Sequence, residues 1–152
     1  MGNIDSHLLA YLAGIIDGEG CLFIQKNNNP KWKSHTLRLQ CRMQEPAEPV
    51  LLLQKTFSGT INSQLPKHVG YNQNRRMISW VISGTTALEA VRILLPYLLV
   101  KKAEAELAIY FCETRKNLTR GSTEEEKVTE LNFRDSCYDK MKLLKKTGGS
   151  LG

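Results

Sequence analysis

Apolar residues near the start of the chain recur at helical spacing. They predict a first helix that is capped by Asp5 or Ser6, runs to about Asp17 and ends at Gly18 or Gly20. The apolar face of this helix consists of Leu8, Leu9, Leu12, Ile15 and Ile16. Two acids, Asp17 and Glu19, are therefore expected at its C-terminal end. The negative end of the helix dipole disfavours acids there unless a cation compensates.

After Gly20 the apolar period changes from helical to two, which predicts strands. A first strand follows Gly20 directly, and a second begins at Thr36 after a turn-prone basic loop over 27–33. The second strand has one apolar face and one cationic, amide-rich face. These faces are Leu37, Leu39, Cys41 and Met43 on one side and Arg38, Gln40, Arg42 and Gln44 on the other.

The rest of the chain repeats this order. Pro49 opens a helix that runs to Phe57, strands follow at 60–64 and 77–83, and helices are predicted at 86–95 and 103–115. A last helix begins where Ser122 and Glu125 form a capping-box pattern. The order αββαββα plus C-terminal helices predicts an α+β fold in which a four-stranded antiparallel sheet carries its helices on one face. Residues 1–147 are expected to form a single domain, followed by a flexible tail at 148–152.

Small residues at four-residue spacing interrupt the first helix: Ala10, Gly14 and Gly18. Glycine within a helix costs roughly 1 kcal/mol relative to alanine, so this stripe needs a reason. It allows a second helix backbone to approach more closely than the usual separation of about 8–10 Å. Pairing two such helices would bring their acidic ends together, and paired carboxylates suit a divalent cation.

The run Leu12-Ala13-Gly14-Ile15-Ile16-Asp17-Gly18-Glu19-Gly20 resembles the signature of the LAGLIDADG homing endonucleases. The resemblance extends over roughly Asp5 to Tyr110 and includes one copy of the motif. Single-motif members act as homodimers on long pseudo-palindromic double-stranded DNA, so the resemblance implies a site-specific endonuclease of intron-homing type. It places Ala10, Ala13, Gly14 and Asp17 at the dimer interface.

The resemblance also implies the catalytic residues. Glu19 and the Gly18 carbonyl would bind Mg²⁺ or Mn²⁺, with Ca²⁺ as a non-catalytic substitute. Lys101 matches the basic residue of the family site, and Lys102 is its neighbour. A water-ordering glutamine falls at Gln44 or, depending on where the strand ends, at Glu45; we assign Gln44.

At two positions the roles known from the family are not assigned directly to residues of this chain. An arginine of related enzymes has no match, because Glu48 and Pro49 occupy its neighbourhood. For Asp17, we favour a structural role at the glycine-rich turn over direct metal binding.

Charge adds a nucleic-acid interface to this picture. The chain has 21 Lys and Arg against 15 Asp and Glu, a formal net charge of +6, and its basic residues concentrate in the middle of the chain. Arg pairs with guanine and Gln or Asn with adenine in the major groove, whereas an ordinary solvated sheet face more often carries Thr, Lys and Glu. The residues expected to contact DNA are Gln25, Arg38, Gln40, Arg42, Asn62, Gln64 and Arg75.

Other chemistry is not indicated. Cys21, Cys41, Cys112 and Cys137 lack zinc-ligand spacing, so reduced thiols in an intracellular compartment are expected. The three histidines are dispersed, and ordinary surface or partly buried positions are expected for them. The apolar segments are too short to span a bilayer, which favours a soluble protein of the cytoplasm or an organelle matrix, without a membrane partner.

Two alternatives remain from sequence. An intron maturase, or a regulator that binds nucleic acid without cleaving it, would share the fold, although Glu19 and Lys101 favour cleavage. A metal-free dimerisation module explains the small-residue stripe but leaves the Arg and Gln face without a role.

Overall fold

The computed structural model describes residues 3–28, 33–66 and 74–147. The centre of the predicted basic loop, at 29–32, and the predicted tail, at 148–152, lie outside these residues. The helices are α1 (Ser6–Glu19), α2 (Glu48–Phe57), α3 (Gly84–Leu94), α4 (Lys102–Thr114) and α5 (Glu124–Lys146), with a short 3₁₀ turn η1 (Leu95–Tyr97). The strands are β1 (Gly20–Asn28), β2 (Lys33–Gln44), β3 (Thr60–Gln64) and β4 (Met77–Ser83).

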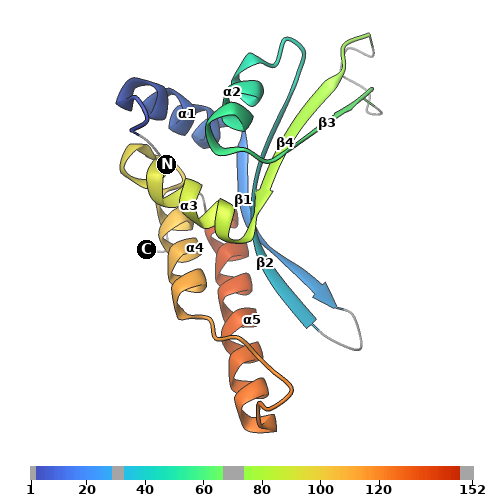
Figure 1. Ribbon diagram of the computed structural model, residues 1–152, viewed down its shortest axis with the longest axis vertical. Coiled ribbons are helices and arrows are strands. Elements are labelled where there is room, and N and C mark those ends of the chain that lie inside the picture. Colours follow the sequence, from blue (N-terminus) through green and yellow to red (C-terminus); the bar gives the residue numbers. More distant parts are fainter. Residues whose placement is uncertain (1–2, 29–32, 67–73, 148–152) are drawn as a thin grey trace.

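The four strands form one antiparallel sheet in the order β1-β2-β4-β3. The helices gather on one side of this sheet, and α5 extends along β1 (Figure 1). Alternate residues of β2 point into the core, including Leu37, Leu39 and Cys41, each about 1% exposed. The predicted α+β architecture with helices on one face is therefore confirmed.

The opposite side of the sheet, here called the free face, carries the polar residues of the same strands. Its members are Gln25 from β1, Arg38, Gln40, Arg42 and Gln44 from β2, and Asn62 and Gln64 from β3. The register brings them into rows across the sheet. Arg42 and Asn62 both pair with Ser79, and Gln44 and Gln64 both pair with Met77.

Helix α1 leads directly into β1. Its N-cap is Asp5, whose side chain accepts the His7 N–H at 3.0 Å, and its last residue is Glu19. A side chain at Gly20 would meet the Ile16 carbonyl oxygen at 2.8 Å, so glycine is required where the helix turns into the strand. The acids thus stand at the C-terminal end of α1, as predicted.

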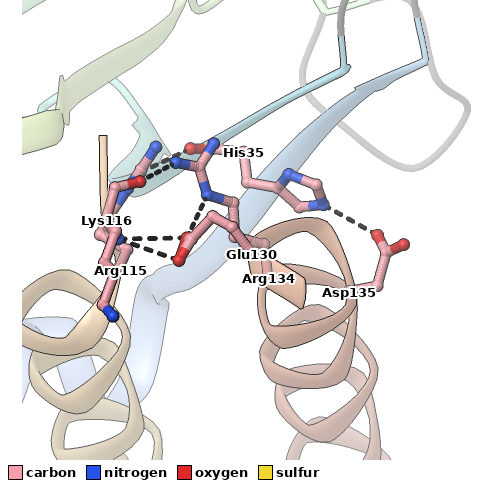
Figure 2. A network of polar contacts seen from close by, with 6 residues as sticks. All are labelled: His35, Arg115, Lys116, Glu130, Arg134 and Asp135. Atoms are coloured by element: carbon pink, nitrogen blue, oxygen red, sulfur yellow. Dashed lines mark hydrogen bonds and ion pairs between the residues drawn. The ribbon is translucent and has the colours of Figure 1, made fainter. Parts of the chain in front are cut away.

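A polar network fastens α5 to the start of β2 and to the segment after α4 (Figure 2). His35 Nε2 lies 2.9 Å from Asp135 Oδ1, and the Arg115 guanidinium donates to the His35 carbonyl at 2.8 Å. Arg134 and Glu130 form a buried ion pair at 2.9 Å, and the Glu130 carboxylate also accepts the Lys116 N–H. These contacts fix α5 relative to the sheet.

His35 departs from the prediction of a surface or partly buried histidine. It is only 1% exposed. It shares the core-facing side of β2 with Leu37 and Leu39, so the period-two pattern, extended two residues upstream, already contained the signal for its burial.

The N-cap of α5 also differs from the prediction. Thr123, not Ser122, accepts the backbone N–H of Glu126 at 3.1 Å, and its hydroxyl lies 3.2 Å from the Glu126 carboxylate. Ser122 instead accepts the Thr119 N–H and closes the preceding turn. The sequence allows two capping boxes, Ser122 with Glu125 or Thr123 with Glu126. The turn closed by Ser122 leaves the second as the one that forms.

All four cysteines are free thiols. No helix in the described ranges is both long and apolar enough to cross a membrane.

Candidate active site and nucleic-acid interface

Asp17 joins the end of α1 to the segment that precedes α4. Its carboxylate accepts the Leu99 N–H at 2.8 Å and the Lys101 N–H at 2.9 Å. The Lys101 ammonium returns to the Asp17 carbonyl at 2.9 Å. Since both carboxylate oxygens are occupied by backbone N–H groups, Asp17 orients Lys101, the N-cap residue of α4. This contact, across more than eighty residues, was missed from sequence, where Asp17 was expected to hold the local glycine turn.

Glu19 lies at the mouth of a hollow on the sheet. It is exposed, and it lines a space of about 320 Å³ together with Arg42, Met43, Gln44 and Met77. The hollow opens where the end of α1 meets the free face. The geometry therefore brings two of the predicted catalytic residues, Glu19 and Gln44, to the surface that also carries Arg42.

Lys101 lies near the same region, because its ammonium reaches the Asp17 carbonyl at the end of α1. Burial and, to a smaller extent, the Glu19 carboxylate raise the pKa of the Cys41 thiol to about 11, and the Lys101 ammonium opposes this rise. Cys41 on β2 thus experiences both charges. Glu19 and Lys101 act on one neighbourhood from α1 and from the start of α4.

Glu104 is a buried acid beneath this region that the sequence did not indicate. It lies in the first turn of α4 and is 6% exposed. Burial raises the pKa of its carboxyl; the Lys101 and Lys145 charges lower this pKa, and Asp17 raises it.

The two candidates for the water-ordering position differ in their surroundings. Gln44 lines the hollow beside Glu19, and its amide donates to the Arg75 carbonyl at 3.2 Å. Glu45 turns toward the start of β4, where its carboxylate accepts the Arg76 N–H at 3.0 Å. This geometry favours Gln44 as the residue beside Glu19.

The predicted DNA-contacting residues share the free face. Gln25, Arg42, Asn62 and Gln64 are exposed, whereas Arg38 and Gln40 are half-buried. Arg38 donates to the Gln25 side-chain oxygen at 2.6 Å, so one amide orients one guanidinium. Arg75 is exposed just before β4.

Helix α1 presents only part of the predicted dimer interface. Ala10 and Gly14 are exposed and Asp17 is half-buried, but Ala13 is fully buried in the core of its own chain. The assignment of Ala13 to the interface was therefore wrong, because Ala13 lies on the same side of the helix as Leu9, Leu12 and Ile16. A Cβ added at Gly14 or Gly18 would meet nothing within 4 Å, so packing inside the chain explains neither glycine.

Two apolar residues next to α1 were not predicted as interface residues. Leu99 is 88% exposed and Val100 60% exposed, in the segment that Asp17 holds against α1. They extend the exposed surface of α1 with apolar side chains. Their signal in the sequence is the run Leu-Leu-Val between Pro96-Tyr97 and two lysines.

A single chain offers few side chains that could bind a metal ion at this site. Within 3–28, 33–66 and 74–147, no cluster of three or more His, Cys, Asp or Glu side chains is arranged to bind one. Glu19 supplies one hard oxygen donor at the hollow, and such donors suit Mg²⁺ and Ca²⁺. The residues fit a divalent ion if a second copy supplies the remaining carboxylate.

Comparisons with known proteins identify the family and the fold. A family model described as LAGLIDADG endonuclease matches residues 12–118. The homing endonuclease I-CvuI in complex with its target in the presence of 2 mM Ca is 22% identical, over 92% of this chain and 85% of that chain, with a TM-score of 0.70. No curated protein sequence matches the chain.

Two further solved structures show the same fold. I-CvuI with an I-CreI target and 2 mM Mg, its DNA not cleaved, is 23% identical over 92% of this chain and 85% of that chain, with a TM-score of 0.69. The intron-encoded I-CeuI, complexed with DNA, is 18% identical over 74% of this chain and 57% of that chain, with a TM-score of 0.57. Because the family model spans well over half of the sequence, the chain belongs to the LAGLIDADG endonuclease family.

Proposed function

We propose that this endonuclease acts as a homodimer that cuts both strands of a long pseudo-palindromic DNA site, with Glu19 of each protomer binding a divalent metal ion. The observation that carries the proposal is the position of Glu19, at a hollow shared by the end of α1 and the free face. A carboxylate at that junction can reach the backbone of DNA whose bases face the sheet.

The exposed surface of α1 supports the homodimer. Gly14 and Gly18 leave open space beside the helix, and Leu99 and Val100 expose apolar surface next to it. Association about a two-fold axis would cover the same patch on both copies and bring the two Glu19 residues together. This pairing would also complete a donor set that is incomplete in one chain.

For the metal we propose Mg²⁺, with Mn²⁺ as an alternative and Ca²⁺ as a non-catalytic substitute, held by Glu19 and the Gly18 carbonyl. When bound, such an ion neutralises charge on the scissile phosphate and lowers the pKa of a water nucleophile. Lys101, oriented by Asp17, stabilises negative charge that develops on the phosphate. Gln44 orients water through its amide, whose nitrogen already donates to the Arg75 carbonyl.

For sequence recognition we propose the free face. Its alternation of Arg, Gln and Asn offers the side chains that pair with guanine and adenine in the major groove. The Arg38 guanidinium, oriented by Gln25, is the best-defined reader of this group.

The test is cleavage of a randomised duplex library by the purified protein, with and without Mg²⁺, followed by sequencing of the cut ends. Mg²⁺-dependent cuts at near-palindromic sites are the expected result. Tight binding to DNA or to structured intron RNA without cutting would instead favour the regulator or maturase.

A further inference from the structure

A groove runs between the edge strand β1 and the C-terminal half of α5, at the border of the free face. Gln25 and Gln40 of the free face line it from the sheet, and Tyr138, Lys142 and Lys145 line it from the helix. The groove is therefore continuous with the surface proposed to face DNA.

Two lysines of α5 stand over aromatic rings in this groove. The Lys145 ammonium lies 5.1 Å from the centre of the Phe23 ring and 3.2 Å from the Cys21 sulfur. The Lys142 ammonium lies 4.9 Å from the centre of the Tyr138 ring. Both lysines are exposed, and within the described parts of the chain no carboxylate lies within 4 Å of either ammonium.

Lys26 lines the same groove but differs in its charge balance. Its ammonium pairs with Asp135 at 2.8 Å, and this contact raises the pKa of Lys26 and lowers that of Asp135. Its charge is therefore already compensated within the chain, whereas Lys142 and Lys145 remain available to an external anion.

The direction of α5 sets where these charges lie. Asp135 contacts Lys26 and His35 at the far end of β1 and the start of β2, and Lys145 contacts Cys21 near the beginning of β1. The helix thus runs antiparallel to β1, and its C-terminal end lies near Glu19. The network of Figure 2 fixes this placement.

We infer that Lys142 and Lys145 bind the sugar-phosphate backbone of the same DNA duplex, beside the bases that β1 and β2 read. Lysine binds phosphate as a point charge. The aromatic rings hold these two ammonium groups at the edge of the free face. The sugar-phosphate backbone would lie at this edge, because it borders the DNA groove that the sheet would enter. This inference rests on the proposed function, because it requires DNA on the free face.

The experiment measures binding of the purified protein to a duplex from its cleaved sites, in Ca²⁺, over a series of salt concentrations. Each phosphate contact contributes about 0.9 to the slope of log K against log salt. The double variant Lys142→Gln/Lys145→Gln is expected to reduce the steepness of that slope by about 3.6, because a dimer would lose four phosphate contacts. It should weaken binding equally for the cleaved site and for DNA sites with altered bases.

Two single variants serve as matched controls. Lys140→Gln removes a charge from the opposite side of α5, and Lys26→Gln removes one that Asp135 already compensates. Both are expected to keep the wild-type slope. Thermal unfolding of every variant checks that the fold is retained.

An unchanged slope in the double variant, beside normal wild-type binding, overturns the inference and leaves the proposed function intact. A loss of discrimination at one base position with an unchanged slope overturns it as well, since base contacts would then be involved. A wild-type protein that does not bind duplex DNA overturns the proposed function and the inference together.

Discussion

At the scale of single residues, the two acids of the motif separate into different roles. Glu19 is exposed at a hollow, while the Asp17 carboxylate is occupied by two backbone N–H groups. The sequence predicted Glu19, Gln44 and Lys101 as members of one site, and the geometry is compatible with that. The sequence could not indicate the hydrogen-bond partners of Asp17, because they lie more than eighty residues along the chain and the contact depends on packing.

Glu19→Gln is expected to slow Mg²⁺-dependent single-turnover cleavage on the order of 10²–10³-fold, because the amide keeps the shape but loses the charge that holds the ion. Binding of the same duplex in Ca²⁺ reports on the fold and the free face. The matched control is Glu106→Gln, an exposed acid on α4, which should cleave normally. Wild-type cleavage by Glu19→Gln would exclude the proposed metal ligand.

Asp17→Asn is expected to destabilise the protein by about 1–3 kcal/mol, since it weakens two hydrogen bonds to a charged acceptor. Cleavage should also slow, but less than in Lys101→Met, because the backbone of Lys101 loses part of its anchor while the ammonium keeps its partner, the main-chain carbonyl at position 17. Thermal unfolding and single-turnover cleavage of the two variants give the comparison. If Asp17→Asn lost stability without losing rate, the role of Asp17 in orienting Lys101 would be wrong.

At the scale of elements, strands were easier to predict than their arrangement. The bounds of β3 and β4 match the predicted ranges, since alternation is a local property of the sequence. The strand order β1-β2-β4-β3 and the position of α5 beside β1 depend on long-range packing. The groove at that edge could therefore not be predicted from the sequence, because it forms only when α5 packs beside β1.

Arg42→Ala should relax sequence choice at one position in each half-site, by about 1–3 kcal/mol against the wrong base pair. Arg42 is exposed on the free face beside Glu19. Cleavage of a library of single-base variants measures the effect. Arg92→Ala is the control, because Arg92 on α3 pairs with Glu113 away from the sheet. Equal weakening on all sites, with a smaller salt slope, would identify Arg42 as a phosphate contact instead.

At the scale of the whole molecule, the proposed function requires two protomers. Gly14→Leu should convert the proposed dimer into a folded monomer, because a side chain there has open space within the chain but would obstruct a second helix. Sedimentation measures the change, and unfolding should remain cooperative. Lys140→Leu adds an apolar side chain of the same size on α5 and should remain dimeric. A wild-type protein that sediments as a monomer, with and without DNA, would refute the paired-carboxylate site.

The bond from Asp17 to Lys101 has a consequence for dosage. It holds the proposed catalytic lysine against the helix on which two protomers are proposed to meet, so the proposed dimer would place both cleavage sites beside its interface. If cleavage requires that dimer, the amount of competent enzyme rises with the square of the amount of protein while subunits are scarce. Under the proposed homodimer, doubling a low expression level would raise cutting about fourfold.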